Sequence, residues 1–415
     1  MAYQKDDRRV RRPYQPASYQ NVRRPAPARP VSRSRGRAQT QQDGFSRLVE
    51  WFRPVKGDID YPFLMAVGLL MAFGLIMLFS AGSARAFSNF GDSLWYFKKQ
   101  IGGVVVGTVG MFILSKFDYH RLGKLSFGLL AFSGLLLVLV IIPGIGTTRN
   151  GATRWLFGFQ PSEIAKFAVI LFFAFSLSKN QKALPDFLHG FCPYLLVLGI
   201  FVLLLALEPH FSCIVLMGLS SFLVLFVAGA KIKHFLIVGA PAVVGAVFMI
   251  IKEPYRMARV VSFLDPFADA QGDGWQIVQS LYAIGSGGIF GVGLGQSRQK
   301  YQSLPEPQND FIFSVLAEEL GLLGAIILVV LFIFLIVRGI KIAGKAPDMF
   351  GTLLVTGIVG IVAFQALINI AVVTSSIPVT GMPLPFFSFG STALSITMAE
   401  MGIVLNVSRQ SHSPL

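Results

Sequence analysis

Two carboxylates and one lysine stand where apolar runs begin, so their side chains can do chemistry beside a membrane. Asp310 directly precedes the apolar residues 311–313, and Glu163 lies in PSEIAKF, three residues before Lys166. A carboxylate at a boundary between water and lipid is partly desolvated and suits a general base, although Asp before a helix is also an ordinary N-cap. Residues three apart share a helix face, so Glu163 and Lys166 form either a functional ion pair or a capping carboxylate beside a snorkelling lysine.

Basic residues gather in the same polar connections and predict the recognition of an anion. Arginine and lysine bind phosphate through charge-assisted hydrogen bonds, and an anion beside a membrane suggests a lipid phosphate or pyrophosphate. The candidates that we select by their local sequence are Arg154, Arg256, Arg259, Arg298 and Lys300. The five histidines and two cysteines have no metal-ligand spacing, so no metal site is predicted.

The elements that must position these side chains are membrane-spanning helices. Hydrophobic residues make up 53% of the 415-residue chain and charged residues only 14%, whereas a soluble protein carries about 25% charge. The apolar runs are continuous and about 20 residues long, which excludes an ordinary soluble enzyme and a transmembrane β-barrel. We predict an all-α polytopic membrane protein with ten transmembrane helices, at residues 62–82, 100–117, 125–143, 162–178, 187–207, 211–229, 234–251, 311–337, 350–373 and 391–407.

The basic residues between the spans predict the orientation. With the N-terminus in the cytoplasm, every short inner connection carries lysine or arginine, as the positive-inside rule requires. These residues are Lys116, Arg121, Lys124, Lys179, Lys182, Lys231, Lys233, Arg338, Lys341, Lys345 and Arg409. Both termini are then cytoplasmic, and the longer loops are external, at residues 83–99, 144–161, 252–310 and 374–390. We therefore expect the function on the outer face.

A basic segment precedes the first span. Residues 1–44 are rich in Arg, Pro, Gln and Ser, which predicts a disordered basic cytoplasmic tail. Contact with anionic lipid explains this tail better than nucleic-acid binding, because no aromatic stacking pattern accompanies the charge. Residues 45–60 form a juxtamembrane segment, residues 61–410 the membrane domain, and residues 411–415 a cytoplasmic C-terminal end.

The external loop at 252–310, between the seventh and eighth helices, is too long for a passive connection, which indicates binding or catalysis. Its partly apolar middle, from Gln279 to Ser286, predicts a helix at the membrane interface, and these two residues are candidates for substrate binding. The glycines at 285, 287, 288, 291, 293 and 295 permit a close backbone approach to another part. The run lacks the Lys-Ser/Thr of a phosphate loop and does not predict a nucleotide site.

Three further carboxylates, Glu318, Glu319 and Glu400, fall inside predicted spans. A charge inside a membrane is costly, and few basic residues are predicted at the same depth. These glutamates are therefore either protonated, hydrogen-bonded structural groups or members of a polar path.

Two connections have a composition that predicts their conformation. Glu208 and His210 flank Pro209, which predicts a tight turn between the fifth and sixth spans. The loop at 374–390 is apolar and rich in Pro and Gly, so we expect it to pack against the protein instead of extending into water.

Four stretches of the sequence resemble the SEDS family (shape, elongation, division and sporulation), which is the FtsW/RodA/SpoVE group, and its FtsW branch most. The stretches are GATRWLFGFQPSEIAKF (151–167), DGWQIVQSLYAIGSGGIFGVGLGQSRQK (273–300), LPEPQNDFIFSVLAEELGLLG (304–324) and INIAVVTSSIPVTGMPLPFFSFGS (368–391). Together with the ten spans and the large loop before the eighth, the resemblance covers about residues 60–410.

The resemblance implies an inverting peptidoglycan glycosyltransferase that polymerises lipid II outside the bacterial cytoplasmic membrane, during cell division or septum formation. It implies a class B penicillin-binding protein and other division-complex membrane proteins as partners, and no nucleic acid. By position, Asp310 matches the family's essential aspartate, Glu163 and Lys166 match its functional pair, and Arg154 matches its basic residue before Trp. A divalent cation, magnesium or manganese, is a candidate to share the pyrophosphate.

The sequence departs from the family pattern at two places. Residues 208–213 read EPHFSC, where many members have a run of the QPDLGT type, so an acidic role at position 210 does not transfer to His210. Residues 386–392 read FFSFGST, where PFISYGGS is commoner, so Phe389 lacks a tyrosine hydroxyl. Neither departure affects Asp310, Glu163 or Lys166.

Other functions share some of these features. A flippase or transporter of lipid II would also use buried carboxylates and cations that bind pyrophosphate. A membrane scaffold would use the basic tail for docking, and an elongation-type, RodA-like polymerase would share the whole site. Asp310 separates a polymerase from a transporter or scaffold, because only polymerisation needs a base at that position.

Overall fold

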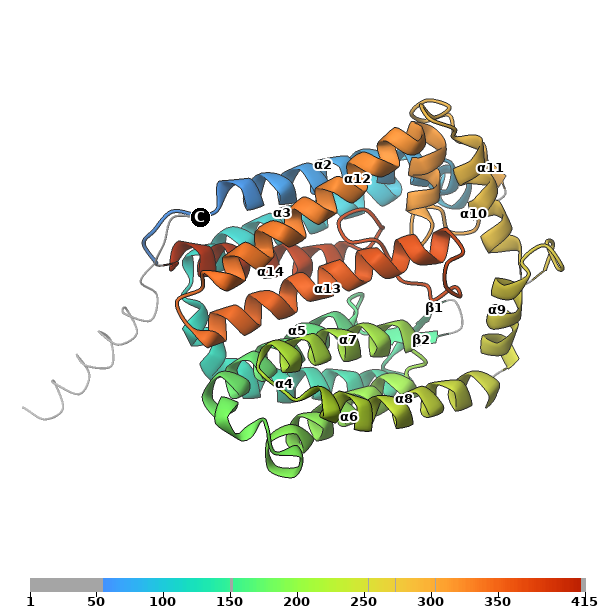
Figure 1. Ribbon diagram of the computed structural model, residues 1–415. Coiled ribbons are helices and arrows are strands. Elements are labelled where there is room, and N and C mark those ends of the chain that lie inside the picture. Colours follow the sequence, from blue (N-terminus) through green and yellow to red (C-terminus); the bar gives the residue numbers. More distant parts are fainter. Residues whose placement is uncertain (1–54, 150–151, 253, 273, 303, 412–415) are drawn as a thin grey trace, which may run out of the picture. The chain divides into compact units, whose positions relative to one another are not determined.

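The computed structural model describes residues 55–149, 152–252, 254–272, 274–302 and 304–411, in which long helices lie side by side (Figure 1). The predicted tail at 1–44, most of the juxtamembrane segment and the last four residues lie outside the described residues. In chain order the elements are α2 (Tyr61–Phe90), α3 (Trp95–Lys116), α4 (Tyr119–Ile141), β1 (Thr147–Arg149), β2 (Ala152–Trp155), α5 (Pro161–Asn180), η1 (Gln181–Ala183), η2 (Phe187–Phe191), α6 (Cys192–Leu207), α7 (Phe211–Val227), α8 (Ile232–Lys252), α9 (Pro254–Leu264), α10 (Trp275–Ser286), α11 (Gln299–Gln302), α12 (Ile312–Gly344), α13 (Met349–Val373) and α14 (Ser391–Arg409).

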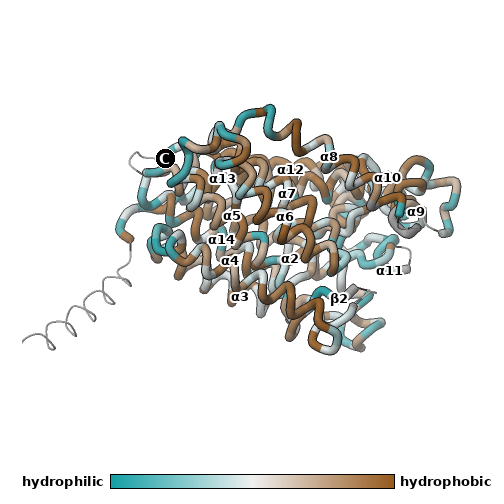
Figure 2. Tube along the Cα trace, turned by 90° about the horizontal axis from the view of Figure 1, so that it is seen from below, coloured by the Kyte–Doolittle hydropathy of each residue, from teal (hydrophilic) through white to brown (hydrophobic). Residues whose placement is uncertain are grey.

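Among the described helices, eight are long and apolar enough to cross a membrane. They are α2, α3, α4, α5, α6 with the turn before it, α8, α12 and α13. Apolar residues line the middle of the helices, and hydrophilic residues gather at their two ends (Figure 2). The predicted all-α membrane fold is confirmed. Helices α7 and α14, with 17 and 19 residues, cover the other two predicted spans, so the count of ten stays a prediction.

Polar residues fix the first turns of several helices. Asp60 caps α2 by accepting a hydrogen bond from the backbone N–H of Phe63 at 2.8 Å. The same carboxylate accepts from Nε of Arg338 at 2.9 Å, which ties the beginning of α2 to α12. Pro161 occupies the first turn of α5, where its missing N–H costs nothing.

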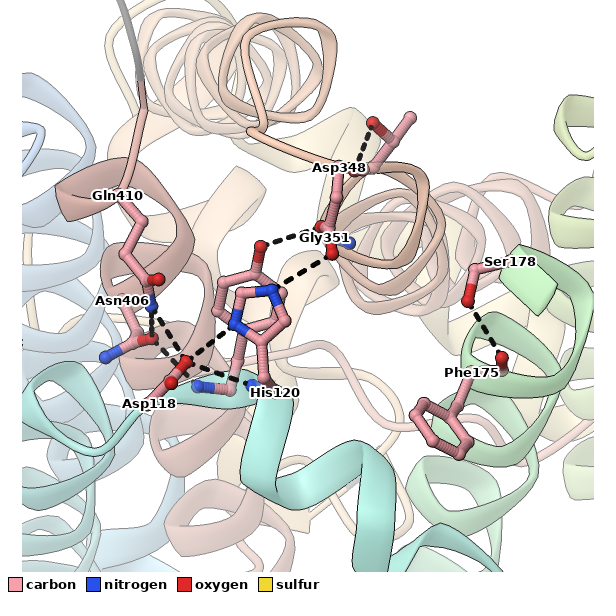
Figure 3. Close-up of polar contacts among 10 residues, drawn as sticks. Asp118, His120, Phe175, Ser178, Asp348, Gly351, Asn406 and Gln410 are labelled. Atoms are coloured by element: carbon pink, nitrogen blue, oxygen red, sulfur yellow. Dashed lines mark hydrogen bonds and ion pairs between the residues drawn. The ribbon is translucent and has the colours of Figure 1, made fainter. Parts of the chain in front are cut away.

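The end of the helices remote from the large loop is joined by a polar network around His120 (Figure 3). Its Nδ1 lies 2.7 Å from Oδ1 of Asp118, and its Nε2 lies 3.0 Å from Oδ2 of Asp348, the N-cap of α13. Tyr119 donates its hydroxyl to Asp348 at 2.7 Å, and its backbone N–H donates to Asn406 at 3.1 Å. The network holds α4, α13 and α14 together at this end.

The loop at 252–310 folds into three helices, α9, α10 and α11. The helix predicted from Gln279 to Ser286 is confirmed as part of α10. Ser280 lies at its centre, with its hydroxyl 2.7 Å from that of Ser314 in α12 and donating to the carbonyl of Val373 at 2.7 Å. One face of α10 is thus buried against α12 and α13, so the helix belongs to the packed domain and does not only rest at the interface.

Helix α12 is broken at Gly321, which has a φ of 67°. The break frees the carbonyls of Glu318 and Glu319, and these accept hydrogen bonds from the N–H groups of Val292 and Gly293, each at 3.0 Å. The loop backbone therefore completes the hydrogen bonding of a helix broken in mid-course, as buried backbone groups require.

The glycine-rich run makes this contact possible. A Cβ at Gly291 would overlap the carbonyl of Glu319, and one at Gly287 would overlap the carbonyl of Ala317. The predicted close approach is confirmed for Gly287 and Gly291, and the part approached is the backbone of α12. The run anchors the loop immediately before the residues that lead to Asp310.

A short antiparallel hairpin, β1–β2, was not expected in the loop between α4 and α5. Thr148 pairs with Thr153, and their hydroxyls lie 2.7 Å apart. Sequence hydropathy does not detect strands this short. The hairpin matters because Arg154 lies on its second strand.

Candidate active site

Asp310 lies in the turn just before α12, and its position is fixed by a side chain of α13. Asn369 donates its Nδ2 to the carbonyl of Asp310 at 2.8 Å and to the carbonyl of Met382 at 2.7 Å. Ser388 donates its hydroxyl to the carbonyl of Asn309 at 2.6 Å. The prediction that the loop at 374–390 packs against the protein is confirmed, and this loop forms the wall beside the aspartate.

The carboxylate of Asp310 is partly buried and faces Gly381. A Cβ on this glycine, which has a φ of 70°, would lie 3.4 Å from Oδ2 of Asp310. Burial raises the pKa of Asp310 to about 6, with a contribution from Glu306 in the same direction, while Arg259 and Arg154 act to lower it. A carboxyl with this pKa is ionised at neutral pH and still basic enough to accept a proton.

The two arginines near Asp310 are oriented by backbone carbonyls. Nη1 of Arg259 donates to the carbonyl of Val379 at 2.9 Å. Arg154 donates from Nε to the carbonyl of Glu208 at 3.4 Å and from a terminal nitrogen to the carbonyl of Pro209. The carbonyl partners orient the two guanidinium groups, and the positive charge of each arginine acts on Asp310.

The predicted pair of Glu163 and Lys166 is present on the first turns of α5. Nζ of Lys166 lies 3.0 Å from Oε2 of Glu163, with side-chain exposures of 7% and 13%. Glu400 of α14 is buried and interacts electrostatically with Lys166. The expectation of few cations at the depth of Glu400 was therefore wrong, because α5 brings its lysine there.

A cavity of about 30 Å³ opens beside this pair. Its lining residues come from α5, from the turn before α7 and α7 itself, from α13 and from the packed loop: Glu163, Lys166, His210, Ser212, Cys213, Leu216, Gln365, Gly381, Met382 and Pro383. Gly381 lines the cavity and also faces Asp310. Gly381 is thus a common neighbour of the candidate base and of the cavity that the Glu163–Lys166 pair lines.

The turn at Glu208–His210 belongs to this site, which sequence reasoning missed. The predicted tight turn is confirmed, with the N–H of His210 donating to the carbonyl of Leu205 at 2.9 Å. Burial raises the pKa of Glu208 to about 8, although Arg154 acts in the opposite direction. The only sequence signal was the departure from the family pattern at 208–213. This signal points to the turn but does not show which residues the turn contacts.

Among the residues that the structure describes, no contact joins Arg298, Gln279 or Ser286 to Asp310. Arg298 is exposed, and its backbone N–H donates to Glu318 at 2.9 Å. Gln279 is buried in α10, and Ser286 donates its hydroxyl within that helix to Ala283 at 3.0 Å. The backbone of Arg256 lies in α9, and its side chain is outside the described ones.

Lys300 lies in a different environment from the one expected of an external cation. Nζ donates to Oε1 of Glu319 at 2.7 Å, to the carbonyl of Gly295 at 2.7 Å and to Oγ of Ser80 at 3.1 Å. The side chains of Lys300 and Glu319 are 1% and 0% exposed. An ammonium has three donors, and all three are used, so Lys300 cannot hold a phosphate without breaking this pair.

No cluster of three metal-ligating side chains was found in the part of the chain that the structure describes. The site combines Asp310 and Glu208, two carboxylates of raised pKa, with two oriented arginines and a buried lysine–glutamate pair. Such a set can remove a proton from a hydroxyl and stabilise an anionic leaving group.

The family model FTSW_RODA_SPOVE, described as "Cell cycle protein", matches residues 61–413. This chain belongs to the FtsW/RodA/SpoVE family. Stage V sporulation protein E of Bacillus subtilis (strain 168) is 44% identical over 347 residues, which cover 83% of this chain and 95% of that protein. A protein from Geobacter sp. (strain M18) named "Probable peptidoglycan glycosyltransferase FtsW" is 40% identical over 360 residues, which cover 86% and 98%.

Solved structures share the fold of this FtsW/RodA/SpoVE family member. A chain from a structure described as "Structural coordination of polymerization and crosslinking by a peptidoglycan synthase complex" has a TM-score of 0.71 at 30% identity. It matches 86% of this chain and 99% of that chain. The rod shape determining protein RodA of Thermus thermophilus has a TM-score of 0.62 at 27% identity, over 86% of this chain and 98% of that one. The family resemblance read from the four sequence stretches is confirmed.

Proposed function

We propose that this protein is an inverting peptidoglycan glycosyltransferase that polymerises lipid II into glycan strands. The observation that carries the proposal is the setting of Asp310, a partly buried carboxylate with a pKa raised to about 6. It lies within the electrostatic reach of Arg154 and Arg259, and Gly381 is a neighbour both of Asp310 and of the cavity of the Glu163–Lys166 pair. Relatives named peptidoglycan glycosyltransferase FtsW support the same reaction.

In the proposed reaction, Asp310 accepts the proton of a sugar hydroxyl of the acceptor lipid II. The hydroxyl oxygen forms a bond to the anomeric carbon of the growing glycan, and the bond from that carbon to the polyprenyl pyrophosphate breaks with inversion. Arg154 and Arg259 stabilise the negative charge of the departing pyrophosphate, and Lys166, oriented by Glu163, adds a third cation. Magnesium or manganese stays a candidate to share the pyrophosphate oxygens.

The substrate-binding set that we propose is narrower than the set selected from sequence. It retains Arg154 and Arg259 and keeps Arg256, Arg298, Gln279 and Ser286 as untested candidates. Lys300 is left out, because its three donors are already used inside the protein. We therefore expect substitution of Lys300 to lower the stability of the fold more than it weakens substrate binding.

The transporter alternative has less support. Such a protein would use Glu318 and Glu319 as steps of a polar path, but Glu319 is paired with Lys300. Glu318 accepts hydrogen bonds from the hydroxyl of Ser297 and from the N–H of Arg298 at 2.9 Å. Carboxylates that are fully bonded within the protein are poor carriers of a moving proton or ion. A non-catalytic scaffold would not need a base at Asp310.

We further propose that the protein lies in the bacterial cytoplasmic membrane with both termini in the cytoplasm and the Asp310 site outside. The basic inner connections support this orientation. A class B penicillin-binding protein is the proposed partner, because the matched complex is described as coordinating polymerization and crosslinking. Similarity to the sporulation protein and to FtsW proteins favours a role at the division septum over elongation.

The test is polymerisation of fluorescent lipid II by the full chain in proteoliposomes, with and without a co-reconstituted class B penicillin-binding protein. Asp310→Asn should lower the rate by about 10²–10⁴-fold, which is the range for losing a general base. Asp265→Asn is the matched control, because Asp265 is exposed in the same loop. Polymer from Asp310→Asn at the wild-type rate would remove the aspartate from catalysis, and flipping without polymer would favour the transporter.

A further inference from the structure

The turn between α6 and α7 concentrates buried polar atoms that have no partner. Nδ1 of His210 and both carboxylate oxygens of Glu208 are buried without a hydrogen-bond partner among the residues that the structure describes. A buried polar atom left unpaired is destabilising, so native proteins rarely keep several within three residues. Their concentration at one turn calls for a partner from outside the chain.

His210 is the member of this turn that reaches the cavity. It lines the space of about 30 Å³ together with Lys166, Ser212 and Gln365. Ser212 donates its hydroxyl to the carbonyl of Thr380, and Gln365 donates its Nε2 to the carbonyl of Pro383 at 2.9 Å. These two side chains are occupied in holding the loop, and Lys166 is paired with Glu163. Of these four lining residues, His210 is the one with a buried side-chain atom that has no hydrogen-bond partner among the residues that the structure describes.

The charge state of the imidazole limits the kind of ligand. Burial, together with the positive charges of Arg154 and Lys166, lowers the pKa of His210 to about 3, so the ring is neutral at physiological pH. A neutral imidazole donates one hydrogen bond and accepts another, which matches a hydroxyl group better than a phosphate. The size of the cavity agrees, because about 30 Å³ gives room for one water molecule or one hydroxyl group.

We propose that His210 is a substrate-binding residue whose imidazole hydrogen-bonds a hydroxyl group of the sugar, directly or through one water molecule, in the cavity beside Lys166. The inference rests on the proposed lipid II polymerase and assigns the sugar part of the substrate to this side of Gly381. The pyrophosphate then belongs mainly to the side of Asp310, where Arg154 and Arg259 act, and Lys166 adds its charge from the sugar side. The turn that carries His210 is held by Arg154, so one arginine connects the two subsites.

The first test compares variants of His210 in proteoliposomes with fluorescent lipid II. His210→Leu should raise KM about tenfold, the loss expected for one hydrogen bond, whereas His210→Gln, which keeps an amide, should stay within about threefold. His234→Leu is the matched control, since His234 is also buried with an unpartnered Nδ1 but packs against Phe187 and Phe191. An unchanged KM in His210→Leu would overturn the assignment.

The second test uses the wild-type protein, so it does not depend on how a variant folds. Neutral imidazoles react with diethyl pyrocarbonate, and mass spectrometry reads the reaction at each histidine. Lipid II should slow the reaction of His210 at least about fivefold and leave the exposed His189 unchanged. Polyprenyl pyrophosphate without a sugar should give no protection. Equal protection by both lipids, or protection by neither, would overturn the sugar assignment.

The two tests separate this inference from the proposed function. Protection of His210 by lipid II, in a protein that makes no polymer, would support the sugar site and contradict the polymerase. Polymer formation with an unprotected His210 and an unaltered KM in His210→Leu would support the polymerase and contradict the sugar site.

Discussion

The molecule contains two buried lysine–glutamate pairs with opposite surroundings. Lys166 and Glu163 lie one turn apart on α5, 3.0 Å from each other, and line a cavity. Lys300 and Glu319 come from different elements, lie 2.7 Å apart and are closed off from solvent, with Ser80 and Gly295 completing the lysine's bonds. We therefore propose that identical residue types support chemistry in one place and hold a loop in the other, and that the open cavity makes the difference.

Replacing each lysine in turn is the most direct test of this contrast between the two pairs. Lys166→Met should lower the polymerisation rate by about 10²–10³-fold, as for the loss of one preorganised group that stabilises a transition-state anion. Its stability should fall little, because water in the cavity can hydrate the remaining Glu163. Turnover of lipid II and thermal unfolding in detergent measure the two effects. A variant that unfolds early and keeps its specific activity would reverse the assignment.

Lys300→Met should have the opposite profile. The carboxylate of Glu319 would stay buried without a cation, which lowers the free energy of unfolding by about 3–5 kcal/mol. The double variant Lys300→Met/Glu319→Leu should recover most of that loss, because replacing a buried ion pair by apolar residues is often neutral. Thermal unfolding and membrane abundance give the measurement. Full stability in the single variant, with KM raised, would return Lys300 to the substrate.

The contrast also explains which part of the site could be predicted from sequence. Helical spacing alone pairs Glu163 with Lys166, because three residues along a helix place two side chains on one face. No such rule pairs Lys300 with Glu319, since their contact depends on how a long loop folds back onto α12. The same limit applies to His210, whose cavity is formed by α5, α7, α13 and a packed loop.

The fold was predictable where hydropathy decides it. The predicted span 350–373 corresponds to α13 at Met349–Val373, which is long and apolar enough to cross a membrane. The break at Gly321 was not predictable, because a glycine inside an apolar run is tolerated in a helix. It becomes intelligible only when the glycine-rich loop is seen to supply the missing backbone partners.

The pH dependence of the reaction tests whether the Lys300–Glu319 pair is electrostatically separate from Asp310. The changes expected here are the smallest of the three. Asp310 works as a base only when ionised, so the rate should fall as the pH drops through about 6 and lose about a factor of ten for each further unit. Arg259→Gln should shift this fall in rate to higher pH, because the arginine lowers the pKa of Asp310. Substitution of Lys300 should leave the pH of this fall unchanged, since the lysine is enclosed with Glu319. If substitution of Lys300 shifted the pH of this fall, the Lys300–Glu319 pair and Asp310 would be electrostatically one site.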